Sequence, residues 1–237
     1  LNAAVDGETA GGEVTIGNSE FYVRLGQRIV HLLTANTRAG RLYEIDMRLR
    51  PNGSSGILVS NLESFKEYQQ EKAWTWEHQA LIRSRPICGD GRMFTRYLEI
   101  KKEIITQPRD PESLKEDIRS MRVRMRKELE KPQEGIFDIK QGRGGIIDIE
   151  FIVQYLSLLH AYEFEELARW PDNVPLIGTL NKTRIIENEV ANALRGAYLT
   201  YRSEVHRLNL QEKAAFVPED TFDGMQHKIA EIWDSIF

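Results

Sequence analysis

Apolar residues recur at helical spacing along most of this 237-residue chain. Residues 19–34 form the first such stretch, and their apolar positions fall on one face of a helix. These positions are Phe21, Leu25, Ile29, Leu32 and Leu33. From Trp74 onward the spacing of three or four residues continues almost to the C-terminus. The pattern predicts helices over 74–85, 89–105, 110–130, 151–168, 173–181, 187–210 and 218–236.

Between these two regions the pattern changes to strict alternation, which predicts β-strands. Residues 41–49 form the clearest example. One face of this strand carries Tyr43, Ile45, Met47 and Leu49, and the other carries Leu42, Glu44, Asp46 and Arg48. We expect the apolar face to lie on a core and the polar face to lie in solvent or in a functional site. Residues 57–59 predict a second, shorter strand.

The chain therefore divides by pattern into an α/β part at 1–73 and a helical bundle at 74–237. The expected fold class is α+β, predominantly α. Two or three predicted strands are fewer than the roughly four to six of a typical sheet. The N-terminus also reads as a loop and lacks an initiator methionine. We therefore expect the α/β part to be a remnant whose other strands are missing from the sequence.

Composition and charge exclude several classes of protein. Apolar residues make up 41% of the chain and charged residues 29%, as in globular proteins with a buried core. A net charge of −4 provides no basic field for nucleic acid. The single cysteine, Cys88, excludes an internal disulfide framework, and no apolar run is long enough to span a membrane. We expect a cytoplasmic protein that binds neither nucleic acid nor membranes.

The first segment with candidate chemistry is the predicted strand and the turn after it. A spacing of two residues along a strand places the side chains of Asp46 and Arg48 about 7 Å apart. This spacing suits a cation and a phosphate held side by side. Arg50 and the backbone N–H groups at Gly53 and Ser54 are further candidates for phosphate contact. The alternative, which these residues alone favour, is a surface ion pair between Asp46 and one of the arginines.

The second segment, 137–150, combines an extended stretch, a glycine-rich turn and a helix start. Glycines permit close backbone approach, and exposed N–H groups at a helix start can bind an anion. Lys140 lies beside the turn, where it either contacts a phosphate or remains solvated. Asp148 and Glu150 fall in the first helical turn, where they are either site carboxylates or partners of the helix dipole. The glycine spacing matches neither the P-loop nor the dinucleotide fingerprint.

Two further segments are interpreted as structural. In one of them Trp74 and Trp76 are expected to lie in a core, and His78 has no second histidine at metal-ligand spacing. In the other, 110–130, charges of both signs recur every three or four residues. That arrangement is typical of a solvated, ion-paired helix.

Three long motifs occur in order along the chain. They are Tyr-Glu-Ile-Asp-Met-Arg-Leu-Arg-Pro-Asn-Gly from Tyr43, Ala-Trp-Thr-Trp-Glu-His-Gln-Ala-Leu-Ile-Arg from Ala73, and Phe-Asp-Ile-Lys followed by Gly-Gly-Ile-Ile-Asp-Ile-Glu-Phe from Phe137. Together they resemble the glutamine synthetase adenylyltransferase family, from about Phe21 to the C-terminus. With Arg-Trp-Pro-Asp-Asn from Arg169, they are similar to the C-terminal, adenylylating half of that bifunctional enzyme.

The resemblance implies that 1–73 is part of a nucleotidyltransferase domain. It implies a parent enzyme that transfers AMP from ATP to a tyrosine of glutamine synthetase, with Mg²⁺, and so regulates nitrogen metabolism. The PII signal protein is a further implied partner. Asp46 matches the third carboxylate of the family's metal site, which binds the metal near the nucleophile and helps to draw off the tyrosine proton. Weaker candidates for nucleotide contact are Arg48, Arg50, Gly53, Ser54 and Lys140.

The family's Gly-Ser motif and Asp-x-Asp pair do not precede Asp46 in this sequence. One carboxylate is too few to hold two Mg²⁺ ions, so we expect an N-terminally truncated fragment that is inactive alone and binds Mg-ATP poorly. Two alternatives remain open. One is an enzyme similar to PII uridylyltransferase, and the other is a non-catalytic helical module for docking or regulation.

Overall fold

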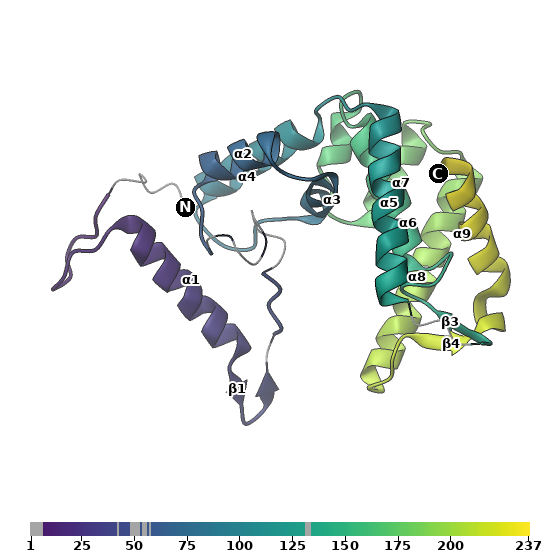
Figure 1. Ribbon diagram of the computed structural model, residues 1–237, viewed down its shortest axis with the longest axis horizontal. Coiled ribbons are helices and arrows are strands. Elements are labelled where there is room, and N and C mark those ends of the chain that lie inside the picture. Colours follow the sequence, from purple (N-terminus) through teal and green to yellow (C-terminus); the bar gives the residue numbers. More distant parts are fainter. Residues whose placement is uncertain (1–6, 42, 48–52, 54–55, 57, 131–133) are drawn as a thin grey trace. The chain divides into compact units, whose positions relative to one another are not determined.

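The computed structural model describes residues 7–41, 43–47, 53, 56, 58–130 and 134–237. Helices dominate the described residues, and the described strands pair only in twos, so the predicted fold class is confirmed (Figure 1). The α-helices are α1 (Asn18–Thr34), α2 (Leu62–Glu71), α3 (Thr75–Arg83), α4 (Gly91–Ile105), α5 (Pro111–Leu129), α6 (Ile146–His160), α7 (Asn173–Lys182), α8 (Asn188–Leu210) and α9 (Asp223–Ile236). The strands are β1 (Asn36–Thr37), β2 (Gly40–Arg41), β3 (Ile136–Asp138) and β4 (Phe216–Pro218), and the 3₁₀ helices are η2 (Glu165–Ala168) and η3 (Glu219–Phe222).

The chain forms two compact units. Unit 1 comprises 1–77 and 86–100, and unit 2 comprises 78–85 and 101–237. These units are clusters of contacts, and the domains predicted at 1–73 and 74–237 stay a prediction. No helix among the described residues is both long enough and apolar enough to cross a bilayer.

Unit 2 is built around α6, which contacts α5, α7, α8 and α9 (Figure 1). Apolar side chains surround almost the whole circumference of this helix, so it is buried on nearly every side. Its buried apolar residues are Ile146, Ile149, Phe151, Ile152, Val153, Tyr155, Leu156 and Leu158. α6 therefore forms the centre of the unit 2 core, and side chains from its first turn are held rigidly.

Of the helices around α6, α5, α7 and α8 begin and end close to the predicted positions because their start signals are local, whereas α9 begins at Asp223, five residues later than predicted. Asp110 caps α5 by accepting a hydrogen bond from the Ser113 N–H at 2.8 Å, and Pro111 occupies the first turn, where proline is tolerated. α7 and α8 lie within one residue of the predicted 173–181 and 187–210. The predicted helix 151–168 is shorter than expected, because α6 ends at His160 and a 3₁₀ turn follows.

A short antiparallel sheet, missed by the sequence analysis, holds the start of segment 137–150. Phe137 of β3 pairs with Val217 of β4. The ring of Phe137 also meets the ring of Tyr201 edge to face, with centroids 5.9 Å apart. These contacts fix the position from which the glycine-rich turn departs.

Unit 1 contains α1, α2, most of α4 and the short hairpin of β1 and β2. Asn61 caps α2 by accepting from the Ser64 N–H at 2.7 Å. Arg96 of α4 forms a hydrogen-bonded ion pair with Glu63 of α2, with atoms 2.9 Å apart. Among the described residues of unit 1, Ile100 is the single buried apolar side chain.

The predicted strand at 41–49 is wrong over its described part. Residues 43–47 adopt no strand, and β2 ends at Arg41. The described part of 57–59, Leu58 and Val59, is not a strand either. Alternation of side chains makes a strand only where a neighbouring strand accepts its backbone hydrogen bonds, and β1 supplies a partner for two residues only.

The expected burial of the tryptophans is wrong for Trp74, whose exposed fraction is 70%. Its backbone N–H is bound at 2.9 Å by the carboxylate of Glu77, which also accepts from the Tyr68 hydroxyl at 3.0 Å. The buried member of this motif in unit 1 is thus the carboxylate, while the indole of Trp74 faces outward.

Candidate functional site

Asp46, the predicted metal-binding carboxylate, lies in an exposed, non-strand segment of unit 1. Three of the residues predicted to act with it, Arg48, Arg50 and Ser54, fall outside the described residues, so their roles stay predictions. Gly53 is described and adopts a positive φ of 57°, as a turn residue does. The choice between a ligand role and a surface ion pair for Asp46 therefore remains as the sequence left it.

The described residues do not complete a metal centre by themselves. No group of three or more His, Cys, Asp or Glu side chains in the described part of the chain is placed to hold a metal ion. Mg²⁺ in phosphoryl-transfer sites is usually held by one or two protein carboxylates together with substrate phosphates. One carboxylate, the predicted role of Asp46, would provide a single ligand position and does not fit a complete two-metal site.

The glycine-rich turn of segment 137–150 is closed on itself instead of open to an anion. The Asp138 carboxylate accepts from the N–H groups of Lys140 and Gln141, both at 2.9 Å. Gly142 donates to the Asp138 carbonyl at 2.8 Å, and Gly145 donates to the Gly142 carbonyl at 3.0 Å. Since these donors already have protein acceptors, the turn offers them to no phosphate in this conformation.

Three glycines of the turn, Gly142, Gly144 and Gly145, are required because other backbone atoms lie close to them. A Cβ on Gly142 would lie 2.6 Å from the Asp138 carbonyl oxygen. Gly144 has a φ of 78°, and a Cβ there would collide with the backbone carbonyl of Gln226 in α9. The glycine motif thus lets the turn pack against α9, which is a structural requirement.

Asp148 is fully buried at the start of α6 and binds two arginines of α5. One carboxylate oxygen accepts from Arg122 Nε at 2.7 Å and from Arg126 Nη2 at 2.9 Å. The other oxygen accepts from the Gly144 N–H at 2.7 Å. The side chains of Asp148 and Arg122 are both 0% exposed. Asp148 therefore joins α5, α6 and the glycine-rich turn, in addition to its predicted position in the first helical turn.

All three guanidinium nitrogens of Arg122 donate to acceptors within the protein. Besides Asp148, its guanidinium donates to the Gln141 carbonyl oxygen at 2.7 Å and to the Gln141 side chain at 3.3 Å. Burial lowers the pKa of Arg122, and the Asp148 charge acts against that shift. A buried charge with this many partners is held in one geometry, so Arg122 connects α5 to α6 and to the glycine-rich turn.

The expectation that 110–130 is simply a solvated helix is wrong for Arg122. A signal for its burial is present in the sequence, because Leu114, Ile118 and Arg122 are spaced by four residues and share one helix face. A charged residue at the end of an apolar stripe indicates a buried ion pair. The partner, Asp148, is distant in the sequence, so the pairing itself is not visible there.

Glu150, on the next part of α6, forms a second and more exposed cluster. Its Oε1 accepts from Arg83 Nη1 at 2.8 Å, from Asn173 Nδ2 at 3.3 Å and from the Tyr198 hydroxyl at 3.5 Å. The side chains of Arg83 and Glu150 are 29% and 18% exposed. Burial acts to lower the pKa of Arg83, but the Glu150 charge and hydrogen bond raise it overall. Glu150 thereby ties α3 to α6, α7 and α8 within unit 2.

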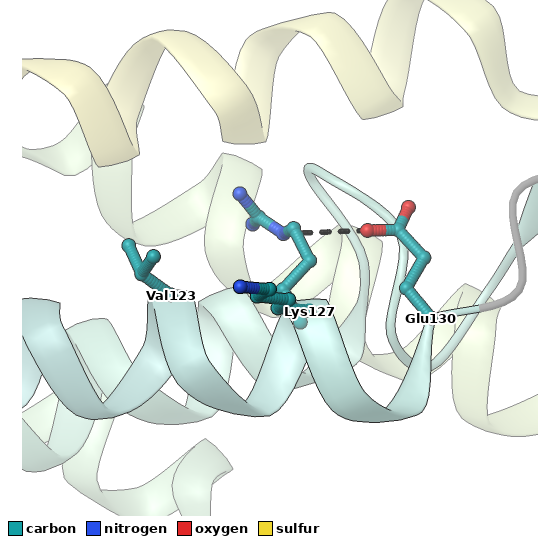
Figure 2. A pocket seen from close by; sticks show the side chains of 4 residues that line it. Val123, Lys127 and Glu130 are labelled. Carbon is teal, nitrogen blue, oxygen red and sulfur yellow. Dashed lines mark ion pairs between the residues drawn. The ribbon is translucent and has the colours of Figure 1, made fainter.

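A pocket of about 320 Å³ lies on α5 and is lined by Val123, Arg126, Lys127 and Glu130 (Figure 2). Through Arg126 it adjoins the buried carboxylate of Asp148. Arg126 Nε and the Glu130 carboxylate lie 3.7 Å apart across it. Burial raises the pKa of Glu130, and the nearby arginines act in the opposite direction. Arg126 is shared between Asp148 and Glu130, and Lys127 adds a second cation to the lining of the pocket. Lys140 is exposed in another part of unit 2, the loop before α6.

Comparison with known proteins finds relatives that align with nearly the whole chain. A family model described as glutamate-ammonia ligase adenylyltransferase matches residues 3–100, and one described as GlnD PII-uridylyltransferase matches residues 112–234. Bifunctional glutamine synthetase adenylyltransferase/adenylyl-removing enzymes align over nearly all of the chain. That of Shewanella loihica is 43% identical over 98% of this chain, and that of Psychromonas ingrahamii is 45% identical over 97%. The chain belongs to the glutamine synthetase adenylyltransferase family.

The chain spans about a quarter of the length of the relatives that it matches. It spans 24% of the Shewanella loihica and Psychromonas ingrahamii proteins and 23% of the Pasteurella multocida protein, which is 43% identical over 97% of this chain. The predicted resemblance is thereby confirmed. The uridylyltransferase alternative is not favoured, because the relatives that align with 97–98% of the chain carry the adenylyltransferase name.

Proposed function

We propose that this chain supplies one metal-binding carboxylate, Asp46, and a supporting helical unit to an enzyme that transfers AMP from ATP to a tyrosine of glutamine synthetase. In this reaction the tyrosine oxygen forms a bond to the α-phosphorus, pyrophosphate leaves, and the tyrosine proton is lost. The observation that carries the proposal is the alignment, at 43–45% identity over 97–98% of the chain, with enzymes named for adenylyl transfer to glutamine synthetase and its removal.

The chemistry of Asp46 fits the role of a ligand. Nucleotidyl transfer generally requires Mg²⁺ to neutralise triphosphate charge and position the attacking oxygen. A carboxylate oxygen is a preferred Mg²⁺ ligand, and Asp46 is exposed, so it can meet both a metal and a nucleotide. Asp148 is a carboxylate of the same type, but two arginines and a backbone N–H already occupy it. Because Asp46 is exposed and Asp148 is fully buried, Asp46 is the better candidate of the two.

Substitution of Asp46 in the complete enzyme tests this assignment. In Asp46→Asn, adenylylation of glutamine synthetase should fall by at least about a thousandfold, because a metal ligand is lost without a change in volume. Transfer of radiolabelled AMP to glutamine synthetase measures this directly. Glu44→Gln is a matched control, since Glu44 is also exposed, lies two residues away and loses the same charge. Near-normal transfer by Asp46→Asn removes this residue from the reaction.

We further propose that the 237-residue chain alone neither transfers AMP nor binds Mg-ATP tightly, because one carboxylate is too few for a two-metal site. Isothermal titration calorimetry with Mg-ATP checks this. Micromolar affinity for this exact chain contradicts the proposal, and weak or absent binding supports it.

We propose glutamine synthetase and the PII protein as the protein partners, in line with the names of the relatives and of the second matching family model. Pull-down of each partner by the 237-residue chain tests this separately from catalysis. Binding of glutamine synthetase without AMP transfer favours the docking role that the sequence left open. Absence of binding assigns recognition to other parts of the enzyme.

A further inference from the structure

The pocket lined by Val123, Arg126, Lys127 and Glu130, the α5 pocket, has the size of a site for a small ligand. Its volume of about 320 Å³ lies at the lower end of the roughly 300–1,000 Å³ that small-molecule sites occupy. The four lining residues are spaced by three and four positions, so one face of α5 supplies all of them (Figure 2). Because α5 packs on the buried helix α6, this face belongs to a well-supported helix.

Arg126 is held at the pocket and keeps hydrogen-bonding capacity there. Its Nη2 donates to both carboxylate oxygens of the buried Asp148, at 2.9 and 3.0 Å. Its Nε is buried and lies 3.7 Å from the Glu130 carboxylate, which is too far for a hydrogen bond. Within the described part of the chain, Nη1 donates to no acceptor. Asp148 thus orients a guanidinium that retains one unused end for a ligand with oxygen acceptors.

Lys127 adds a positive charge that has no ion-pair partner among the residues described, and its side chain is exposed. The charged groups connected through Arg126 are Arg122, Asp148 and Glu130. Together with Lys127 they comprise three cations and two carboxylates, which leaves one positive charge in excess. An excess of this size suits a monoanion. A dianion would gain less, because the Glu130 carboxylate repels each of its charges.

Val123 supplies an apolar wall beside these cations. Its side chain is 56% exposed. The methylene stems of Arg126 and Lys127 add apolar surface to the same lining, since they follow Val123 by three and four residues. A single exposed valine needs no explanation. An apolar wall next to two cations, however, matches a ligand that has an apolar part and a negatively charged end.

We propose that the α5 pocket binds a small organic monocarboxylate, with the carboxylate on Arg126 Nη1 and Lys127 Nζ and the apolar chain against Val123. A planar carboxylate accepts two hydrogen bonds side by side, which suits a guanidinium end and a neighbouring ammonium. The pocket belongs to unit 2, and the proposal depends neither on Asp46 nor on AMP transfer. Its tests measure binding alone, so its failure and the failure of the proposed function are distinguishable.

Titration of the isotope-labelled 237-residue chain with sodium butyrate, followed by amide NMR, tests the proposal. The amides of Val123 and Lys127 should shift along a saturable curve with a millimolar dissociation constant, because two charge-assisted hydrogen bonds at a partly exposed site give modest affinity. Acetate has a shorter apolar part and should bind at least about threefold more weakly. Sodium chloride at matched ionic strength is the control for screening. Shifts that do not saturate, or that chloride reproduces, overturn the proposal.

Substitution of Lys127 separates a specific site from general attraction by the helix. Lys127→Gln should weaken butyrate binding at least about fivefold, because it removes one of the two donors and the excess charge. Lys115→Gln is the matched control, since it removes the same charge from the same helix, twelve residues away and outside the pocket lining. Arg126 stays in place because it also holds Asp148. Equal weakening by both substitutions, or none by Lys127→Gln, contradicts the assignment.

Glu130 provides a change in the opposite direction. Its carboxylate lines the pocket and repels a bound anion, so Glu130→Gln should tighten butyrate binding at least about twofold. Glu128→Gln removes the same charge from an exposed position outside the lining and should have a smaller effect. Weaker binding by Glu130→Gln shows that this carboxylate attracts the ligand, and a monocarboxylate is then the wrong class.

Inorganic phosphate distinguishes the two common kinds of oxyanion. At pH 7.5 phosphate is mostly a dianion, which the Glu130 carboxylate repels more strongly than a monoanion, and it has no apolar part to contact Val123. Phosphate should therefore bind more weakly than butyrate in the same titration. Tighter binding of phosphate than of butyrate overturns the assignment of the ligand as a carboxylate.

Discussion

Acidic side chains have opposite surroundings in unit 2 and in the region of unit 1 around α1 and Asp46. In unit 2, Asp148 and Arg122 are both 0% exposed and satisfy each other within a packed core. In unit 1, Asp46 is exposed and lies where no apolar side chain among the described residues 7–77 is buried. We therefore expect unit 2 to provide most of the stability, and substitution of the exposed Asp46 to cost little stability.

The comparison shows that neither the residue type of a carboxylate nor the motif in which it occurs tells whether its role is structural or chemical. Asp46 and Asp148 both come from long motifs of the family and both are acidic. Asp148 has two arginines and a backbone N–H as partners, and its removal leaves Arg122 charged in the core. Substitutions that measure stability and activity separately sharpen this contrast.

The largest effect is expected for Asp148→Asn. Removing one partner of a buried ion pair leaves an uncompensated charge, and this should lower the free energy of unfolding by about 3–5 kcal/mol. Urea denaturation followed by circular dichroism measures the loss. Glu128→Gln, on the exposed side of α5, removes a negative charge without burial and should change little.

A double-mutant cycle makes that prediction sharper. Removing both charges, in Asp148→Leu with Arg122→Met, should cost less than the sum of the two single substitutions, because neither charge is then left alone in the core. Additive losses contradict the view that Asp148 and Arg122 act as one buried pair.

The next effect in size is expected for Gly144→Ala in the glycine-rich turn. The left-handed backbone and the collision with the Gln226 carbonyl should together cost about 2–3 kcal/mol. Gly178 in α7 is the matched control, because a Cβ there meets open space in a helix. Gly178→Ala should raise the free energy of unfolding by about 0.5–1 kcal/mol. A Gly144→Ala variant as stable as the parent removes the close approach to α9 as the reason for the motif.

The sequence predicts the parts of the fold that depend on local signals. α7 and α8 were located within a residue because apolar periodicity and helix starts are contained in the helices themselves. The strand at 41–49 was wrong, because alternation shows only that a segment suits a sheet, and the neighbouring strands decide whether one forms.

The candidate site was only partly predictable for the same reason. The sequence selects Asp46, Asp148 and Glu150 as acidic candidates, but their roles depend on partners that are distant along the chain. Arg122 is 26 residues from Asp148, and Arg83 is 67 residues from Glu150. No spacing rule connects such positions, so the partners of Asp148 and Glu150 are visible only in the three-dimensional structure.

A smaller effect, visible through pH, is expected at Lys101, which is 2% exposed. Its ammonium donates to the carbonyls of Ile82 and Ser84 at 2.7 and 2.8 Å, and burial lowers its pKa from 10.5 to about 8. Between pH 8 and 10.5 the unfolded chain binds this proton more tightly than the folded chain. The free energy of unfolding should therefore rise with pH across that window.

The Lys101→Met variant isolates this contribution, because it lacks the titrating group and leaves the other ionisable residues in place. Between pH 7.5 and pH 10, the parent should gain about 2 kcal/mol relative to the variant. Urea denaturation at both pH values measures the change. A difference between the two proteins that is independent of pH contradicts a depressed pKa for Lys101.

The smallest effect on stability is expected for Asp46→Asn, and this prediction decides whether the contrast between the two carboxylates holds. Asp46 is exposed, and substitutions at exposed positions away from special backbone features usually leave the stability of a protein nearly unchanged. The urea midpoint of the 237-residue chain should therefore stay within experimental error, whereas the same change at Asp148 lowers it strongly. A loss of stability in Asp46→Asn comparable to that in Asp148→Asn assigns Asp46 a structural role, and any loss of AMP transfer in the complete enzyme then follows from unfolding.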